Sequence, residues 1–383
     1  MEVYFDNAAT TAPYCEVVEE VAYAMKNYYG NPSSVHKLGL VAEKKLNYAR
    51  EVLGSMINAD KDEIIFTSGG SESNNFLLKA FLKPEAHIIT TKIEHPSILN
   101  TAKSLEENGI EVTYLDVDEN GRVNLESLKA ALKKETILVS VMAVNNEIGI
   151  IEDLQAIGEI VRAHGKAKFH VDAIQGYGKI NIDVKKFNID LLSASGHKIH
   201  GPRGIGFAYV KKNLIPRPLI YGGGQEHGIR SGTENVANAL GFAKATEIIK
   251  CNFKENYDKV TEIKKHFIEG LSGIKDISIN SPLEDGFSPY ILSVSFKGVR
   301  GEVLLHMLEA DGIYVSTGSA CSSKDKNFSH VLTAVGVGKD YIDGTIRFSF
   351  SDMNTLEEVD YTLSILEKSL KFLRRIRIWI NLY

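Results

Sequence analysis

A lysine, an aspartate and a histidine each stand at or just after the end of an apolar run in this sequence. Lys198 follows DLLSASGH, Asp172 ends KFHVD, and His95 follows HIITTKIE. A desolvated lysine can form a Schiff base with an aldehyde, a carboxylate can keep a pyridinium nitrogen protonated, and a histidine can stack on a ring or move protons. Taken singly, each has an ordinary alternative: a solvated loop lysine, a helix-capping aspartate and a satisfied core histidine.

A glycine turn and an asparagine occupy similar places. FTSGGSES at 66–73 leads from an apolar run through Gly70 and Ser71 into a helical pattern. Small residues let backbone N–H groups approach an anion, so this turn could hold a phosphate, although it lacks the GK[ST] ending of a P-loop. Asn146, in VNNEIG, also follows an apolar run, where its amide could contact a ring oxygen or a substrate carboxylate.

The elements that would position these residues alternate along the chain. Helical spacing of apolar residues recurs at 74–82, 96–108, 124–134 and 153–164. Short apolar, β-rich runs lie at 64–67, 87–91, 112–117, 137–143, 168–171, 190–194 and 205–210. This alternation predicts an α/β fold with a mostly parallel seven-stranded sheet covered on both faces. Ligands bind outside the carboxyl ends of such strands, so the candidate residues are expected to share one pocket.

The pattern changes after residues 234–270, which favour one long helix or two. Strands are expected at 291–296, 313–317 and 345–350, and helices at 302–312 and 356–376. The expected organisation is a large domain over residues 15–255 and a smaller α+β domain formed by 1–14 and 256–383. The ending LRRIRIWINLY is interpreted as the end of a packed helix, with a partner-binding tail as the alternative.

Composition excludes several classes of protein. Among 383 residues, 44 are basic and 49 acidic, and the net charge of −5 argues against an electrostatically driven nucleic-acid binder. No signal-peptide pattern and no apolar run of membrane-spanning length is visible. Three scattered cysteines fit neither a disulfide scaffold nor a clustered metal site, which favours a reducing, cytoplasmic setting.

The neighbours of the three cysteines differ. Cys321 lies in a stretch of small residues followed by Lys324 and Lys326, which could favour an accessible thiolate. The small and charged composition of 316–328 predicts poor order there. Cys15 and Cys251 lie in helix-like segments and are predicted to be packing thiols.

Motifs along nearly the whole chain closely resemble those of cysteine desulfurases of the NifS/IscS type, in the class V, fold-type I aminotransferase superfamily. They are YFDNAATT, GNPSSVH, FTSGGSES, EHPSIL, NNEIG, HVDAIQ, SGHKIHGPRGIG, GGGQEHGIRSGT, STGSACSS and TIRFSF. Departures include His227 where arginine is common and Ser351 where glycine is frequent. The C-terminal tail also differs from that of housekeeping members, which leaves the sulfur acceptor open.

The resemblance implies a role for each matching residue. Lys198 would carry pyridoxal 5'-phosphate as a Schiff base, and His95 would stack on the ring as a candidate acid or base. Asp172 and Gln175 would contact the ring nitrogen and phenolic oxygen, and Cys321 would be the nucleophile. The phosphate would be bound by Gly70, Ser71, Ser195 and His197, with Thr233 reaching over from the partner of a homodimer, and the substrate carboxylate by Asn146 and Arg347.

The implied activity is conversion of L-cysteine to L-alanine, with a persulfide formed on Cys321. Its sulfur would pass to an acceptor protein, such as an iron–sulfur scaffold or a tRNA-thiolation protein. The nearest alternatives are a selenocysteine lyase and a cysteine sulfinate desulfinase. A non-catalytic sulfur-relay platform would tolerate loss of Lys198, and a NAD-dependent oxidoreductase would need a G-x-G-x-x-G turn after its first strand, which is missing.

Overall fold

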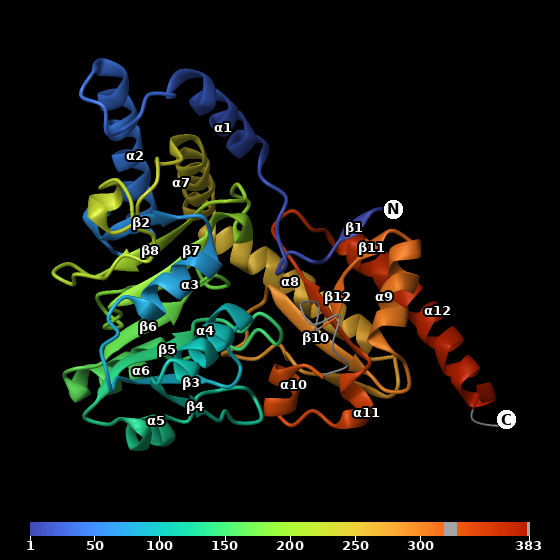
Figure 1. The fold of residues 1–383 in the computed structure, drawn as a ribbon. Helices are drawn as coiled ribbons and strands as arrows, with labels where there is room; N and C mark the ends of the chain where they lie inside the picture. The colour runs from blue at the N-terminus through green and yellow to red at the C-terminus, as the bar shows by residue number, and fades with distance from the viewer. Residues whose placement is uncertain (318–327, 381–383) are drawn as a thin grey trace.

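A seven-stranded sheet forms the centre of the larger part of the molecule (Figure 1). The computed structural model describes residues 1–317 and 328–380, the last five by backbone alone. The strand order is β2-β8-β7-β6-β5-β3-β4, and β8 alone runs against its neighbours. The strands are β2 (Ile64–Thr67), β3 (His87–Thr91), β4 (Glu111–Leu115), β5 (Thr136–Met142), β6 (Lys168–Asp172), β7 (Leu191–Ser195) and β8 (Gly206–Val210).

Helices cover both faces of this sheet because its strands are apolar on both sides. Ile64 and Phe66 belong to one hydrophobic cluster, while Ile65 between them belongs to another, as the two-residue period of a strand requires. The first cluster includes residues of α1 (Cys15–Asn27), α2 (Lys37–Ser55), α6 (Leu154–His164) and α7 (Val236–Cys251). One residue of α5 (Leu125–Ala131) also belongs to this first cluster. The second cluster includes residues of α3 (Gly70–Lys79) and α4 (Pro96–Glu107).

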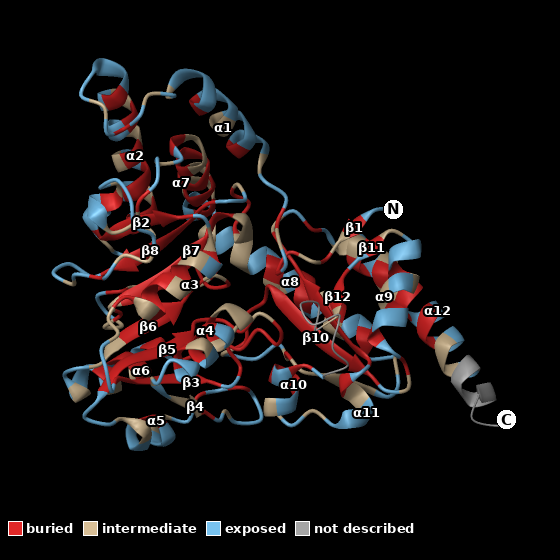
Figure 2. Cartoon of the chain, viewed as in Figure 1, coloured by how far each residue is buried: buried red, intermediate tan, exposed pale blue. Residues whose placement is uncertain are grey.

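A second hydrophobic core forms around an antiparallel sheet ordered β12-β13-β10-β9. Val3 and Phe5 from the start of the chain are buried in it, and Val3 pairs with Ile313. The strands here are β1 (Val3–Tyr4), β9 (Ile277–Ile279), β10 (Ile291–Phe296), β11 (Ile313–Tyr314), β12 (Ser316–Thr317) and β13 (Thr345–Ser349). The helices are α8 (Phe253–Leu271), α9 (Gly301–Ala310), α10 (His330–Ala334), α11 (Lys339–Ile342) and α12 (Leu356–Ile380). Figure 2 shows the buried strands of both sheets beneath more exposed helices.

The predicted α/β fold with a mostly parallel seven-stranded sheet is confirmed. Residues 234–270 form two helices, which meet at Asn252, and 313–317 form two short strands rather than one. The prediction that Cys15 and Cys251 are packing thiols is wrong: both are exposed, one at the first position of α1 and the other at the last position of α7. Among the described residues, no helix has both the length and the apolar character needed to cross a bilayer.

Candidate active site

The candidate residues gather at one edge of the large sheet, where its parallel strands end. The glycine turn follows β2, His95 follows β3, and Asn146 follows β5. Asp172 is the last residue of β6, and β7 ends at Ser195, directly before the 3-10 turn η2 (Gly196–Lys198) that carries His197 and Lys198. Asp172 lies close enough to His95 and Lys198 for their charges to influence each other. The topology therefore brings residues from five strands together.

The N-terminal segment closes over Lys198. The ammonium Nζ donates to the backbone oxygens of Ala8 at 2.6 Å and Ala9 at 2.8 Å. The side-chain amide of Gln175 donates to the same Ala8 oxygen at 2.8 Å. A small cavity of about 20 Å³ lies beside Lys198 and is also lined by Lys179 and Tyr290. The motif YFDNAATT is thus part of the site, although sequence reasoning assigned no role to its residues.

Lys179 is a second lysine of this region that sequence reasoning missed. It is 7% exposed, and its Nζ lies 3.5 Å from the amide oxygen of Gln175 and 5.4 Å from the ring centroid of Tyr290. Burial, together with the charges of Lys198 and Arg347, lowers the pKa of Lys179 to about 7. The signal in the sequence was weak, because QGYGK places this lysine in a turn where most lysines are solvated.

Asp172 is a buried carboxyl held by neutral donors. It is 3% exposed, and Asn74 Nδ2 donates to its Oδ2 at 2.8 Å while the backbone N–H of Ile174 donates to its Oδ1 at 3.0 Å. Burial raises the pKa of Asp172, and these donors together with the nearby His95 and Lys198 oppose the rise. A carboxyl in such a place favours a cationic hydrogen-bond donor as its partner, and a protonated pyridine nitrogen is one.

Two histidines of the site are biased towards the neutral form. His95 caps the N-terminus of α4, and its Nδ1 accepts from the backbone N–H of Ser97 at 3.1 Å. Burial is the largest influence on its pKa, which is lowered despite the charge of Asp172. The Nδ1 of His197 lies 3.2 Å from the hydroxyl of Thr10, and burial, followed by the charge of Lys198, lowers the pKa of His197 to about 4.

The glycine turn has the properties of an anion cradle. Gly69 has φ 154° and ψ −176°, a conformation essentially restricted to glycine, and α3 begins at the next residue. The first-turn N–H groups of α3 have no acceptor within the helix. The hydroxyl of Ser195 is buried beside this turn without a hydrogen-bond partner among the described residues. Unpaired donors at a helix N-terminus fit a phosphate group.

Arg347 connects the two sheets. It lies in β13, and its guanidinium donates to the carboxylate of Asp6 at 2.9 Å and to the backbone oxygen of Asn146 at 2.9 Å. Its Nε is buried without a partner among the described residues. The two predicted carboxylate-binding residues are therefore neighbours, although their contact uses the backbone of Asn146. Asp6 is a further residue of the site that the sequence did not reveal.

Two predicted site residues remain: one is not joined to this cluster, and the other is not among the described residues. Thr233 is exposed, and no hydrogen bond links it to the other candidates within the part of the chain that the structure describes. Cys321 lies outside the described residues, together with most of the 316–328 segment for which the sequence predicts poor order, so that prediction stays a prediction. The described stretch before this gap ends at Thr317, next to Ser316, whose neighbour across the ladder is Arg347.

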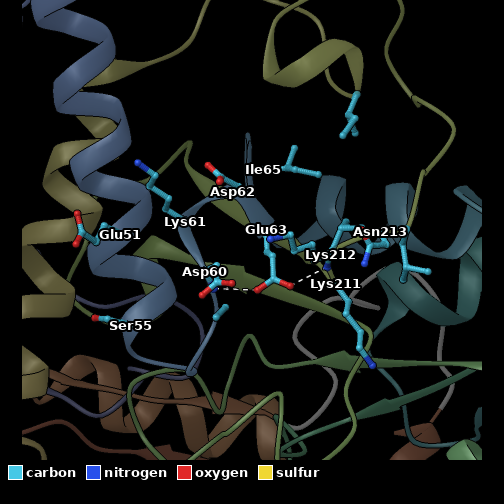
Figure 3. A pocket seen from close by; sticks show the side chains of 14 residues that line it. Glu51, Ser55, Asp60, Lys61, Asp62, Glu63, Ile65, Lys211, Lys212 and Asn213 are labelled. Atoms are coloured by element: carbon cyan, nitrogen blue, oxygen red, sulfur yellow. Dashed lines mark hydrogen bonds between the residues drawn. The ribbon is translucent and has the colours of Figure 1, made fainter.

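A larger hollow lies elsewhere on the molecule. The hollow has a volume of about 540 Å³ and is formed by α2, the 3-10 turn η1 (Lys61–Glu63) and the segment after β8. Figure 3 shows the side chains that line it. The carboxylate of Glu63 accepts from the backbone N–H groups of Asp60 and Lys212 at 2.8 and 2.7 Å, so the side chain is already satisfied. None of the predicted site residues that the structure describes is in the lining.

A lysine, a buried aspartate and an anion-binding turn at the edge of a parallel sheet define the type of site that pyridoxal phosphate enzymes use. The model of the aminotransferase class-V family matches residues 3–362. The chain belongs to this family. Membership implies dependence on pyridoxal 5'-phosphate. The Ser195 hydroxyl, which has no partner among the described residues, fits such a group, as do the cradle and Asp172.

Within this family, the chain is similar to proteins named cysteine desulfurase and to a NifS-like structure. The chain is 44% identical to "Cysteine desulfurase IscS" of Clostridium botulinum (strain Hall), covering 97% of this chain and 94% of the relative. It is 43% identical to "Cysteine desulfurase IscS" of Methanosarcina thermophila, covering 97% and 93%. A solved structure described as a "NIFS-LIKE PROTEIN" superposes with a TM-score of 0.91 at 41% identity, covering 97% of this chain and 100% of that one.

Proposed function

We propose that this protein is a pyridoxal phosphate-dependent cysteine desulfurase, which converts L-cysteine to L-alanine and leaves the sulfur as a persulfide on Cys321. The observation that carries the proposal is the full-length similarity to proteins named cysteine desulfurase, at 43–44% identity over 97% of the chain. The arrangement of Lys198, Asp172 and the anion cradle supports it independently.

Each residue has a proposed task. Lys198 is the amine that bonds the cofactor aldehyde, and the same amine is proposed to take up or release a proton at the substrate carbon. Gly70, Ser71, Ser195 and His197 bind the phosphate. Bound pyridoxal phosphate supplies an electron sink that stabilises negative charge at the substrate carbons. Asp172 sustains this sink by keeping the ring nitrogen protonated, Gln175 contacts the phenolic oxygen, and His95 covers the ring.

The substrate carboxylate is proposed to bind Arg347 and Asn146. A guanidinium offers paired donors in a plane that matches a carboxylate. In the described state Arg347 already contacts Asp6, so the substrate would share or replace that partner. Burial keeps the arginine charge away from water, which strengthens its attraction for a carboxylate.

The sulfur transfer uses Cys321 as the nucleophile. Its thiolate attacks the sulfur of the bound cysteine, the S–S bond forms, and the Cβ–S bond breaks. The electron pair of the broken bond and one proton go to Cβ, which becomes the methyl group of alanine. Cys321 is left as a persulfide, so the sulfur is oxidised while the substrate carbon is reduced, and no external oxidant is required.

Substitution of Cys321 tests this function. Cys321→Ser should abolish the formation of alanine from L-cysteine while the protein keeps its cofactor absorbance. Cys251→Ser is the matched control, because that thiol is exposed and distant in sequence, and it should retain full turnover. The formation of alanine from selenocysteine and from cysteine sulfinate by the wild-type protein is measured in parallel, to test the selenocysteine lyase and desulfinase alternatives. Undiminished release of sulfide from L-cysteine by the Cys321 variant would refute the persulfide route.

Chemical trapping tests the role of Lys198. Reduction of the holoenzyme with borohydride should fix a pyridoxyl group on the peptide that contains Lys198. Lys179→Met is the matched control for a second buried lysine and should still be labelled at Lys198. Labelling at Lys179 in the wild-type protein would contradict the assignment.

A homodimer is proposed as the working assembly, with Thr233 of one subunit contributing to the phosphate site of the other. Its support is a set of exposed apolar side chains on α1, α2 and the connection between them, since soluble single chains rarely expose such a surface. The set includes Val18, Tyr23, Met25, Tyr29, Val35, Leu38 and Leu40. Sedimentation equilibrium should give twice the chain mass of 42.3 kDa, and Tyr29→Glu should lower it towards one chain.

The remaining expectations are also proposals. We place the large domain at residues 15–255 and the small domain at 1–14 and 256–383, supported by the hydrophobic core of the small sheet, whose residues all come from the latter two ranges. The protein is proposed to act in the cytoplasm and to pass sulfur to a thiol of an acceptor protein, for example in iron–sulfur assembly or tRNA thiolation. Incubation with ³⁵S-cysteine and capture of labelled partners tests the acceptor.

A further inference from the structure

The ring of His95 is connected to Asp172 by a chain of hydrogen bonds through two residues with no assigned role. Asn74 is fully buried in α3, and its Nδ2 carries two N–H groups. One donates to Asp172 Oδ2 at 2.8 Å and the other to Ser97 Oγ at 2.8 Å. Ser97 Oγ in turn lies 2.8 Å from His95 Nδ1. Asn74 therefore links the two candidate groups that flank the cofactor ring.

The direction of these bonds fixes the tautomer of His95. A backbone N–H can only donate, and that of Ser97 donates to Nδ1 at 3.1 Å, so Nδ1 has no proton. Ser97 Oγ accepts from Asn74, and its single proton is free to point at the same Nδ1. With Nδ1 occupied as an acceptor, the proton of a neutral imidazole must be on Nε2.

The same arrangement opposes protonation of the ring. A proton on Nδ1 would face the fixed N–H of Ser97, and Nε2 has no lone pair to accept one while it bears its own hydrogen. Burial is the largest influence on the pKa of His95 and disfavours the imidazolium. Asp172 favours the imidazolium, whereas Lys198 and His330 oppose it, and the pKa of His95 is lowered on balance.

We propose that Asn74 and Ser97 are positioning residues that hold His95 as the neutral tautomer protonated on Nε2, so that His95 acts as a ring surface and hydrogen-bond donor. Proton movement at the substrate carbons then belongs to Lys198. This inference rests on the proposed function, because it divides the work of the same site between two candidate acid–base groups.

Nitrogen NMR of the full-length holoenzyme labelled with ¹⁵N-histidine tests the tautomer directly. His95→Gln assigns the signal among the 11 histidines. The expected result is an unprotonated Nδ1 and a protonated Nε2 at neutral pH. A protonated Nδ1, or an imidazolium, would overturn the proposal. This readout does not depend on turnover: a protein with the expected tautomer that makes no alanine from cysteine would refute the proposed function and support this inference.

Substitution of Ser97 tests the positioning role. Ser97→Ala removes the O–H donor to Nδ1, which stabilises the neutral ring, so the acid dissociation constant of His95 should fall about three- to tenfold. Ser97→Thr keeps the hydroxyl and should restore the wild-type titration. Asn108→Ala, at the exposed far end of α4, is the matched control and should change nothing. An unchanged titration of His95 in Ser97→Ala would contradict the positioning role of Ser97. If that variant does not fold, the tautomer of His95 measured in the wild-type protein decides the proposal.

Chemical rescue tests the division of labour between the two groups. His95→Gln keeps an N–H donor and should remain within about tenfold of wild-type turnover, the effect of one neutral hydrogen bond. The turnover of Lys198→Ala should be about 10²–10⁴-fold lower than that of wild type, which is the usual contribution of a positioned acid–base group. Added methylamine should restore part of this turnover. If the turnover of His95→Gln is reduced as strongly and is restored by added imidazole, His95 is the proton carrier and the proposal is wrong.

Discussion

Glu152 offers a test of how burial sets the energetics of this fold. It follows an isolated bridge between Val144 and Ile151 and is 5% exposed. Its Oε2 accepts from the backbone N–H of Val123 at 3.1 Å, while its Oε1 is buried without a partner among the described residues. Burial raises the pKa of Glu152 from 4.5 to about 8, with the charge of Asp118 adding to the rise. The native state therefore favours the protonated carboxyl.

The sign of the pH dependence follows from this shift. In the unfolded chain the carboxyl loses its proton near pH 4.5, whereas in the folded chain it keeps it up to about pH 8. The stability contributed by Glu152 is present below pH 4.5 and is lost as the pH rises through 8. At about 1.4 kcal/mol per unit, the loss between pH 5.5 and pH 8.5 is about 3 kcal/mol.

Glu152→Gln removes the ionisation and keeps the shape of the side chain. Relative to wild type, the free energy of unfolding of the variant should rise by about 3 kcal/mol more at pH 8.5 than at pH 5.5. Urea titrations followed by circular dichroism at the two pH values measure it. Glu159→Gln, on the exposed side of α6, is the matched control and should leave the difference near zero. Equal pH slopes for Glu152→Gln and wild type would refute the reasoning.

Three other substitutions probe the cradle, the carboxylate site and the core. Gly70→Ala should cost about 1–3 kcal/mol of unfolding free energy, because its Cβ would lie 2.2 Å from Ile174 Cδ1; Ile174→Ala in the same chain should recover most of it in a double-mutant cycle. Arg347→Lys should raise KM for L-cysteine about ten- to a hundredfold through loss of the paired donors, and an unchanged KM would place the carboxylate elsewhere. Arg50→Leu should cost about 3–5 kcal/mol in thermal or urea unfolding, because it leaves the buried carboxylate of Glu226 without its ion pair at 2.7 Å.

The strands of the large sheet were predictable because each is a continuous apolar run that ends at a polar residue. β2 and β3 have the predicted bounds, and β5 and β7 differ by one residue at each end. The chemistry at the strand ends was predictable for the same reason: a parallel sheet brings the ends of distant runs to one edge. Lys198, Asp172 and His95 could therefore be grouped before any contact was known.

The connections within the site were not predictable from local patterns. Asp6 contacts Arg347, and Ala8 contacts Lys198, across more than 180 residues of sequence in each case. Asn74 lies within a helical pattern, where its spacing indicates neither Asp172 nor Ser97 as a partner. The exposure of Cys15 and Cys251 was also missed, because an apolar window indicates a helix but not which way its end residues face.

The N-terminal segment has a consequence for how the protein is made. Val3 and Asp6 leave the ribosome well before their partners Ile313 and Arg347, which are synthesised more than 300 residues later. At about 5–20 residues per second, the segment waits roughly 15–60 s for these partners. During that interval the large sheet can form, while the segment that covers Lys198 still lacks its partners in the small sheets. Synthesis from a circularly permuted gene that begins near residue 256 would place the segment between its partners and the large sheet and shorten the wait.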